Sequence, residues 1–95
     1  MIEILQFRLV PDTDEAAFLA ADRGVQTEFA YQQPGLLRRT TARGDDGEWI
    51  VIDVWRSDAD ATAADERWEQ DPAARRFMSF VDRTSVRTKR YATLD

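Results

Sequence analysis

Apolar residues recur along the chain at two different spacings, and together the spacings predict strands alternating with helices. Segments that are rich in β-branched and aromatic residues, or that alternate between apolar and polar residues, predict strands. These segments are Ile2–Val10, Leu36–Arg43, Trp49–Ser57 and Val86–Tyr91. Apolar residues at helical spacing predict one helix from about Thr13 or Asp14 to Tyr31. They predict a second helical region from Ser57 or Asp58 to Gln70.

Turn-forming residues separate these segments where breaks are expected. Gln33-Pro34-Gly35 ends the first helix, and Gly44-Asp45-Asp46-Gly47 is typical of a hairpin between the second and third strands. Asp71-Pro72 predicts a break and restart of the second helix, because proline fits the first turn of a helix. An apolar stripe of Phe77, Met78 and Val81 is then expected on the restarted helix.

The resulting order is β-α-β-β-α-β, with the second helix broken at Pro72. This order predicts an α+β, ferredoxin-like fold with a four-stranded antiparallel sheet and helices on one face. The first and third strands are expected in the centre of the sheet. Residues 1–95 are too few for a second core, so a single domain is expected.

Charged residues occur at two positions that the pattern predicts to be buried. Asp53 lies in the middle of the third strand, where a charge needs a partner. Asp22 falls on the apolar face of the first helix, close to Phe18. Arg8 or Gln6 of the first strand could supply the cation or hydrogen-bond donors that these carboxylates need.

Composition excludes several classes of function. The net charge of −5 argues against a general nucleic-acid binder, which needs a basic surface. The chain has no cysteine and no histidine, which removes thiol chemistry, the commonest general base and the commonest metal ligand. No metal site is expected. No apolar run approaches the roughly 20 residues of a membrane span and no signal peptide is evident, so a cytoplasmic protein without membrane contact is expected.

Short motifs in the same order resemble a known family. They are Gln33-Pro34-Gly35-Leu36 after the first helix, Val54-Trp55-Arg56-Ser57 at the end of the third strand, and Asp71-Pro72 with Phe77 before the last strand. With the element order, they resemble the dimeric α/β-barrel superfamily, and within it the antibiotic-biosynthesis-monooxygenase-like domains. The resemblance implies a homodimer formed by sheet-to-sheet packing, with any active site between each protomer's sheet and its own helices.

The resemblance also assigns expected roles to particular positions. Trp55 matches the tryptophan that oxygenase relatives carry on the third strand, and Gln6 corresponds to an asparagine on the first strand of haem-degrading relatives. Asp65 corresponds approximately to their haem-ligating histidine, and Val51 to an asparagine of quinone-forming monooxygenases. Without histidine, haem ligation of the family type is not expected. No cofactor is therefore predicted.

Two assignments of the sheet faces remain open at this stage. If the helices cover the more apolar side chains of the first and third strands, the residues that face them are Leu5, Phe7, Leu9, Ile50, Ile52 and Val54. The resemblance instead turns Gln6, Arg8, Asp53 and Trp55 toward the helices, and a buried Asp22 favours this second assignment. It predicts a polar cleft, with the apolar residues of the first assignment in the dimer seam.

Two functions follow as hypotheses. The first is a cofactor-independent, monooxygenase-like enzyme acting on an aromatic or polyketide-like small molecule. Its expected catalytic residues are Trp55, which stacks on the ring, Arg8, which stabilises an anion, and Asp53, which accepts a proton. Its expected substrate-binding residues are Gln6, Phe18, Asp22 and Asp65. The alternative is a non-catalytic dimer of the same fold that binds a small molecule or has only a structural role. The basic residues Arg38, Arg39, Arg87, Lys89 and Arg90 are interpreted as solvated strand faces.

Overall fold

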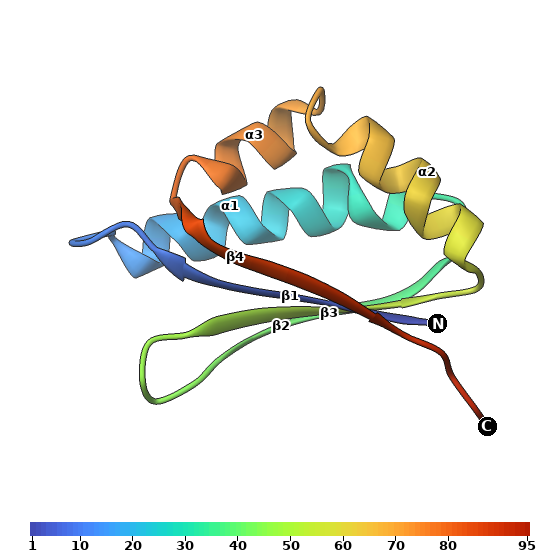
Figure 1. Cartoon of the computed structure of the whole chain (residues 1–95). Coiled ribbons are helices and arrows are strands. Elements are labelled where there is room, and N and C mark those ends of the chain that lie inside the picture. The colour runs from blue at the N-terminus through green and yellow to red at the C-terminus, as the bar shows by residue number, and fades with distance from the viewer.

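A computed structural model describes residues 1–95 as one sheet covered on one face by helices (Figure 1). The elements are β1 Ile2–Leu9, α1 Glu15–Glu28, a 3₁₀ turn η1 Ala30–Gln32, β2 Leu36–Arg43, β3 Trp49–Trp55, α2 Asp58–Trp68, α3 Pro72–Met78 and β4 Val81–Tyr91. The four strands are antiparallel in the order β2-β3-β1-β4. The predicted ferredoxin-like β-α-β-β-α-β fold is confirmed, with β1 and β3 central and a break before Pro72.

Each α-helix begins at a polar side chain that caps its free amide groups. The Asp14 carboxylate accepts from the Ala16 backbone N–H at 3.0 Å, and the Ser57 hydroxyl accepts from the Asp60 N–H at 3.1 Å. At α3, the Asp71 carboxylate accepts from the Ala74 N–H at 3.0 Å, with Pro72 in the first turn. These local signals explain why the helix starts were predictable from the sequence.

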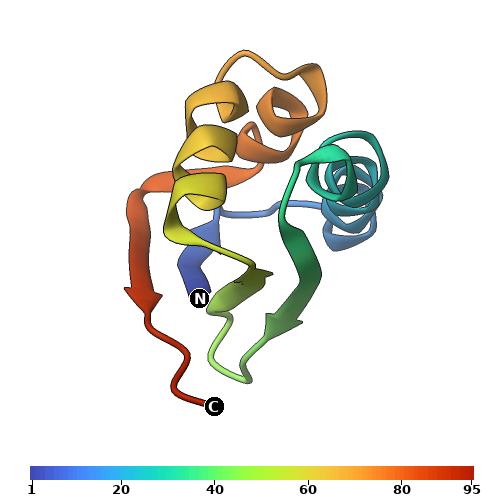
Figure 2. The ribbon, with the colours of Figure 1, turned by 90° about the vertical axis from the view of Figure 1, so that its right-hand side faces the viewer.

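The helices divide the covered face of the sheet between them. Figure 2, which looks roughly along the strands, shows α1 above the β2 side of the sheet and the α2–α3 pair above the β1 and β4 side. The α1 helix packs against α3, and α2 reaches the sheet chiefly at β3. This arrangement leaves the opposite face of the sheet without a covering layer.

The register of β1 with β3 decides which residues face the helices. Glu3 lies opposite Asp53, Leu5 opposite Val51 and Phe7 opposite Trp49. Paired residues of an antiparallel ladder share a face, so the odd-numbered residues of both strands point toward the helices. Neither predicted assignment is therefore right as a whole. The assignment by apolar side chains is correct for β1 and wrong for β3, and the resemblance is correct for β3 and wrong for β1.

The main core is aromatic and lies between α1, α3 and the end of the sheet near the β2–β3 hairpin. Phe18 and Phe77 have no exposed surface, and Phe7 is almost fully buried. Their rings meet edge to face or tilted, with centroids 5.2–5.9 Å apart. This packing holds α1 and α3 in place over β1.

The last strand begins earlier than the sequence pattern predicts. β4 starts at Val81, which pairs with Leu9, so Val81 belongs to the sheet and not to the apolar stripe expected on the second helix. The reason is a tight turn after α3, in which the Phe80 N–H donates to the Phe77 carbonyl at 3.1 Å. None of the helices is both long enough and apolar enough to cross a membrane.

Candidate functional site

A cavity of about 220 Å³ lies between the sheet and the α2–α3 pair. All four strands and both helices contribute to its wall. The lining residues are Glu3, Leu5, Arg39, Val51, Asp53, Asp65, Trp68, Phe77, Met78, Val86 and Thr88. The wall therefore combines apolar and aromatic side chains with three carboxylates and one guanidinium. Such a mixture is typical of small-molecule sites.

Asp53 and Trp55 each have a buried polar side-chain atom without a hydrogen-bond partner, and of the two only Asp53 lines the cavity. The unpartnered atom of Asp53 is Oδ1. The nearest cation is the Arg39 guanidinium, whose Nε lies 4.0 Å from this oxygen, which is too far for a hydrogen bond. Burial raises the pKa of Asp53 to about 7, against the lowering effect of Arg39, and the charges of Glu3, Asp65 and Asp22 raise it further. Asp53 can therefore accept and release a proton near neutral pH.

Arg39 is held in the cavity wall by a buried network. Its side chain is only 3% exposed, and its Nη2 donates to Asp22 Oδ1 at 2.8 Å. The Thr41 hydroxyl donates to the same oxygen at 2.9 Å. On the other side of the guanidinium, the Phe77 ring centroid lies 5.9 Å away. The guanidinium is therefore fixed beside Asp53 while its main ion pair is with Asp22.

Arg90, at the end of β4, binds two of the carboxylates that line the cavity. Its Nε donates to Glu3 Oε2 at 2.9 Å, its Nη1 to the Thr62 hydroxyl at 2.9 Å, and its Nη2 to Asp65 Oδ2 at 2.8 Å. Burial raises the pKa of Glu3, and the hydrogen bond from Arg90 opposes that rise. One arginine thus ties the edge strand, the central strand β1 and helix α2 together.

The first strand does not supply the predicted polar wall. Arg8 and Gln6 lie on the face of the sheet away from the helices, since they alternate with the buried Glu3 and Phe7. Arg8 Nη1 donates to the Asp46 carbonyl at 2.9 Å in the hairpin turn, and Gln6 contacts Glu48. The predicted pairing of Arg8 or Gln6 with Asp53 and Asp22 is therefore wrong. Arg39 is the partner of both carboxylates.

The other predicted site residues divide between the cavity and the core. Asp53 and Asp65 line the cavity, and Asp22 lies behind it as the partner of Arg39. Phe18 is completely buried in the aromatic core and does not reach the cavity. Trp55 faces the helices but packs beneath α2 against Ala61 and Ala64, also outside the cavity. The aromatic side chains that reach the cavity are Trp68 and Phe77.

Arg39 is the residue that reasoning from the sequence missed. It was interpreted as a solvated strand residue, but only 6% of it is exposed. The hairpin contained the signal, because the turn at residues 44–47 places Arg39 directly opposite Asp53. Arg38, its neighbour on the other face, is exposed as predicted. Tracing the hairpin register back from the turn would have paired the odd charge of β3 with Arg39.

The residues present do not form a recognisable metal centre. No group of three or more carboxylate, cysteine or histidine side chains is arranged to hold a metal ion. The cavity offers a proton acceptor with a pKa near neutrality, a fixed cation beside it and apolar side chains in the same wall. This combination can bind a weakly acidic organic molecule and stabilise its anion.

Comparisons with known proteins connect this fold to oxygenases. No protein-family model matches the chain, and no curated protein sequence matches it. Among solved structures, it is similar to SnoaB, a cofactor-independent oxygenase from Streptomyces nogalater (TM-score 0.79, 18% identity, covering 99% of this chain and 92% of that one). It is also similar to an antibiotic biosynthesis monooxygenase (TM-score 0.74, 14% identity, all of both chains).

A third similar structure is a dimeric ferredoxin-like protein from an uncultured marine organism (TM-score 0.67, 10% identity, covering 99% of this chain and 87% of that one). The structural neighbours are thus antibiotic-biosynthesis-monooxygenase-like proteins of the ferredoxin-like fold. The resemblance expected from the short motifs is confirmed at the level of the fold.

Proposed function

We propose that the cavity binds a hydroxylated aromatic or polyketide-like compound and that the protein oxygenates it without a cofactor. The observation that carries this proposal is Asp53 Oδ1, a buried carboxylate oxygen that has no hydrogen-bond partner and lies beside the fixed guanidinium of Arg39. An unsatisfied acceptor inside a cavity is the place where a ligand O–H or acidic C–H would bind. The similarity of the fold to that of a cofactor-independent oxygenase also supports this proposal.

The chemistry begins with a proton transfer. Asp53 takes the acidic proton of an anthrone-like CH₂ group, and the resulting carbanion is delocalised onto a ring oxygen whose charge Arg39 stabilises. The electron-rich anion reduces dioxygen and forms a carbon–oxygen bond. The peroxide takes back the proton from Asp53, and loss of water leaves a carbonyl group. In balance, one CH₂ group and one O₂ give one C=O group and one H₂O.

The roles of the residues differ from those expected from the sequence. Arg39 takes the anion-stabilising role first assigned to Arg8, because Arg8 lies on the other face of the sheet. Trp68 and Phe77 provide the aromatic wall first assigned to Trp55. Asp53 keeps its role as proton acceptor, and its pKa of about 7 suits a base that works near neutral pH.

The uncovered face of the sheet supports a homodimer. It carries the half-buried residues Ile2, Ile4, Ile50, Ile52 and Val54. A contiguous apolar face on a chain of 95 residues is typical of an interface, because a small domain gains stability by burying it. Two copies packed sheet to sheet would cover this face and leave both cavities accessible on the helix sides.

Oxygen consumption with 1,8-dihydroxyanthrone tests the proposed reaction. The rate above that of buffer alone is measured for the unaltered protein, for Asp53→Asn and for Asp45→Asn. Asp45 is a matched control because it lies exposed in the hairpin turn, outside the cavity. We expect Asp53→Asn to lose at least about a hundredfold in rate, the lower end of what a general base typically contributes. Asp45→Asn should retain full activity.

Two results would contradict the proposal. If the unaltered protein consumes no oxygen above the buffer rate but binds the anthrone, it is a non-catalytic binding protein, which is the alternative function. If Asp53→Asn consumes oxygen as fast as the unaltered protein, Asp53 is not the proton acceptor. Quinone formation, followed by absorbance, should match oxygen uptake one to one.

A further inference from the structure

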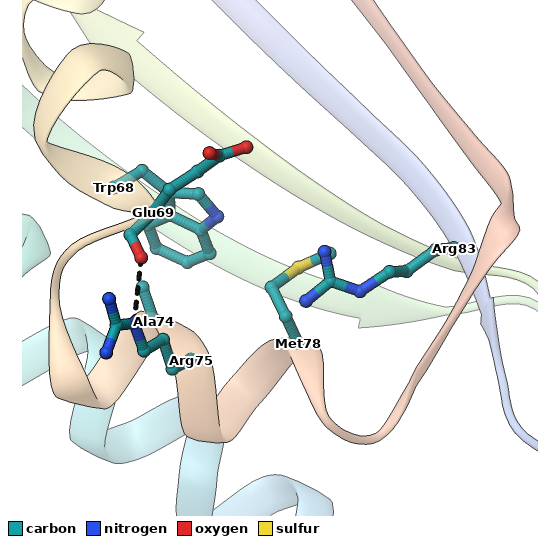
Figure 3. A pocket seen from close by; sticks show the side chains of 6 residues that line it. All are labelled: Trp68, Glu69, Ala74, Arg75, Met78 and Arg83. Carbon is teal, nitrogen blue, oxygen red and sulfur yellow. Dashed lines mark hydrogen bonds between the residues drawn. The ribbon is translucent and has the colours of Figure 1, made fainter.

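A second cavity adjoins the first on the outer side of the α2–α3 connection (Figure 3). Its volume is about 350 Å³, and its lining residues are Trp68, Glu69, Ala74, Arg75, Met78 and Arg83. Trp68 and Met78 also line the inner cavity. These two side chains are therefore a shared boundary between the two spaces. The view in Figure 3 looks past them toward the strands of the sheet.

The two cavities differ in charge. The inner one is lined by Glu3, Asp53 and Asp65 and by a single cation, Arg39, which already pairs with Asp22. Arg90 pairs with Glu3 and Asp65, so Asp53 is the carboxylate left without a close cation. The outer one carries two arginines against one carboxylate, that of Glu69. Carboxylates, which accept hydrogen bonds, therefore predominate in the inner cavity, and positive charge predominates in the outer one.

The two arginines of the outer cavity are not equally engaged. Arg75 Nε donates to the backbone carbonyl of Glu69 at 2.9 Å, which anchors that side chain at the end of α2. The exposed side chain of Arg83 forms no hydrogen bond and no ion pair within the chain, and in Figure 3 its guanidinium extends toward Met78. A free guanidinium at the edge of a cavity is suited to a ligand carboxylate, which it can bind through two hydrogen bonds.

Size also favours a ligand that uses both spaces. The inner cavity of about 220 Å³ is smaller than the roughly 300–1,000 Å³ typical of sites for drug-sized molecules, and the outer cavity adds enough volume to reach that range. The boundary between them contains Met78, whose unbranched side chain changes rotamer readily. The indole of Trp68 offers a flat apolar surface on which a ring can pack.

We infer that the two cavities form one binding site, and that its substrate carries a ring hydroxyl at the Asp53 end and a carboxylate at the Arg83 end. This inference rests on the proposed function for the inner cavity and adds the substrate class. The hydroxyl donates to the unsatisfied Asp53, the ring passes between Trp68 and Met78, and the carboxylate pairs with Arg83. A substrate with a carboxylate at the inner end is disfavoured, because the one cation that lines that end, Arg39, already pairs with Asp22 and the neighbouring Asp53 is acidic.

Two probes that differ in one group test this assignment. The first is 2-naphthol, which has a hydroxyl group and no charge, and the second is 6-hydroxy-2-naphthoate, which adds a carboxylate at the far end. Dissociation constants are measured by calorimetry for the unaltered protein, for Arg83→Gln and for Arg76→Gln. Arg76 is the matched control, since it is exposed on α3 and lines neither cavity. Both variants lose one positive charge.

The expected result is selective. Arg83→Gln should weaken the binding of 6-hydroxy-2-naphthoate by roughly two- to fivefold, the size of a partly exposed ion pair, and leave 2-naphthol unchanged. Arg76→Gln should change neither constant. If 2-naphthol binds but Arg83→Gln does not affect the naphthoate, the outer cavity is not part of the site and this inference is wrong. If neither probe binds, the inner cavity is not the site, and the proposed function fails with it.

Discussion

Glu3 and Asp53 face each other across the β1–β3 ladder, with both side chains on the face of the sheet that the helices cover. Residues paired in this way have Cβ atoms about 5 Å apart. The charge of Glu3 therefore raises the pKa of Asp53, in addition to the larger effect of burial. Glu3 is paired with Arg90, so it is the ionised Asp53 that reduces the stability of the fold unless a ligand or a proton satisfies it.

Asp53→Asn is expected to stabilise the protein, and more at pH 8 than at pH 4.5. The carboxyl has a pKa of about 7 in the folded chain and near 3.8 when unfolded. As the pH rises from 4 to 7, the unfolded chain loses this proton first, so stability falls. At about 1.4 kcal/mol per pH unit, the loss is on the order of a few kcal/mol.

Urea unfolding at fixed protein concentration measures this difference, because the proposed dimer would make stability depend on concentration. Asp45→Asn is again the control, and its effect should be small at both pH values. If Asp53→Asn increases the free energy of unfolding by the same amount at pH 4.5 and at pH 8, the raised pKa of Asp53 is contradicted.

Arg39→Gln is expected to destabilise the protein strongly, by roughly 3–5 kcal/mol, because it leaves Asp22 as a buried charge without a cation. The double variant Asp22→Asn with Arg39→Gln should be less destabilised than the sum of the single variants, since neither charge is then left alone. Arg38→Gln is the matched control on the exposed face of the same strand. Chemical unfolding is measured for the unaltered protein, the two single variants, the double variant and the Arg38→Gln control. Equal effects at positions 38 and 39 would show that the ion pair contributes little.

Ile52→Glu is expected to convert the protein from a dimer to a monomer. Ile52 lies in the centre of the uncovered sheet face, opposite Ile4 on β1 and Thr40 on β2. A carboxylate there would be buried without a partner in a sheet-to-sheet interface. Ala20→Glu places the same charge on an exposed position of α1 and should leave the dimer intact. Sedimentation velocity at micromolar concentration distinguishes the two states. A monomeric mass for the unaltered protein would refute the proposed interface.

Trp55→Phe is expected to leave the affinity for 2-naphthol unchanged, because Trp55 packs beneath α2 and does not line the inner cavity. Trp68→Leu should weaken that affinity, since Trp68 forms part of the cavity wall. Calorimetric titration of the two variants compares them directly. If Trp55→Phe weakens the binding of 2-naphthol and Trp68→Leu does not, Trp55 contacts the ligand, as the family resemblance implies.

Arg90→Gln is expected to raise the pKa of Glu3 further, because it removes the hydrogen bond that opposes the effect of burial. The carboxyl carbon shift of Glu3, followed by NMR across a pH titration, measures this change. Arg87→Gln, which breaks a more exposed ion pair with Glu48 on the other face of the sheet, should leave the titration of Glu3 unaltered. An unchanged titration in Arg90→Gln would show that the hydrogen bond between Arg90 and Glu3 does not form in solution.

The sequence alone determined the elements whose signals are local. Capping residues mark where the helices begin, Pro72 marks the break, and the turn at residues 44–47 marks the hairpin. Each of these signals acts over a few residues, so it operates before any distant part of the chain is in place. The hairpin also determined that Arg39 and Asp53 are neighbours, although that relationship was not recognised in the pattern.

Only the tertiary structure decided how β1 aligns with β3. The two strands are separated by a helix and another strand, so no turn sets their register. A shift of one residue would place Gln6 and Arg8 inside and Leu5 and Phe7 outside. Packing of Phe7 against Phe18 and Phe77 selects the observed register, because the aromatic core cannot form in the other. That same choice brings Glu3 beside Asp53 and thereby creates the acidic end of the cavity.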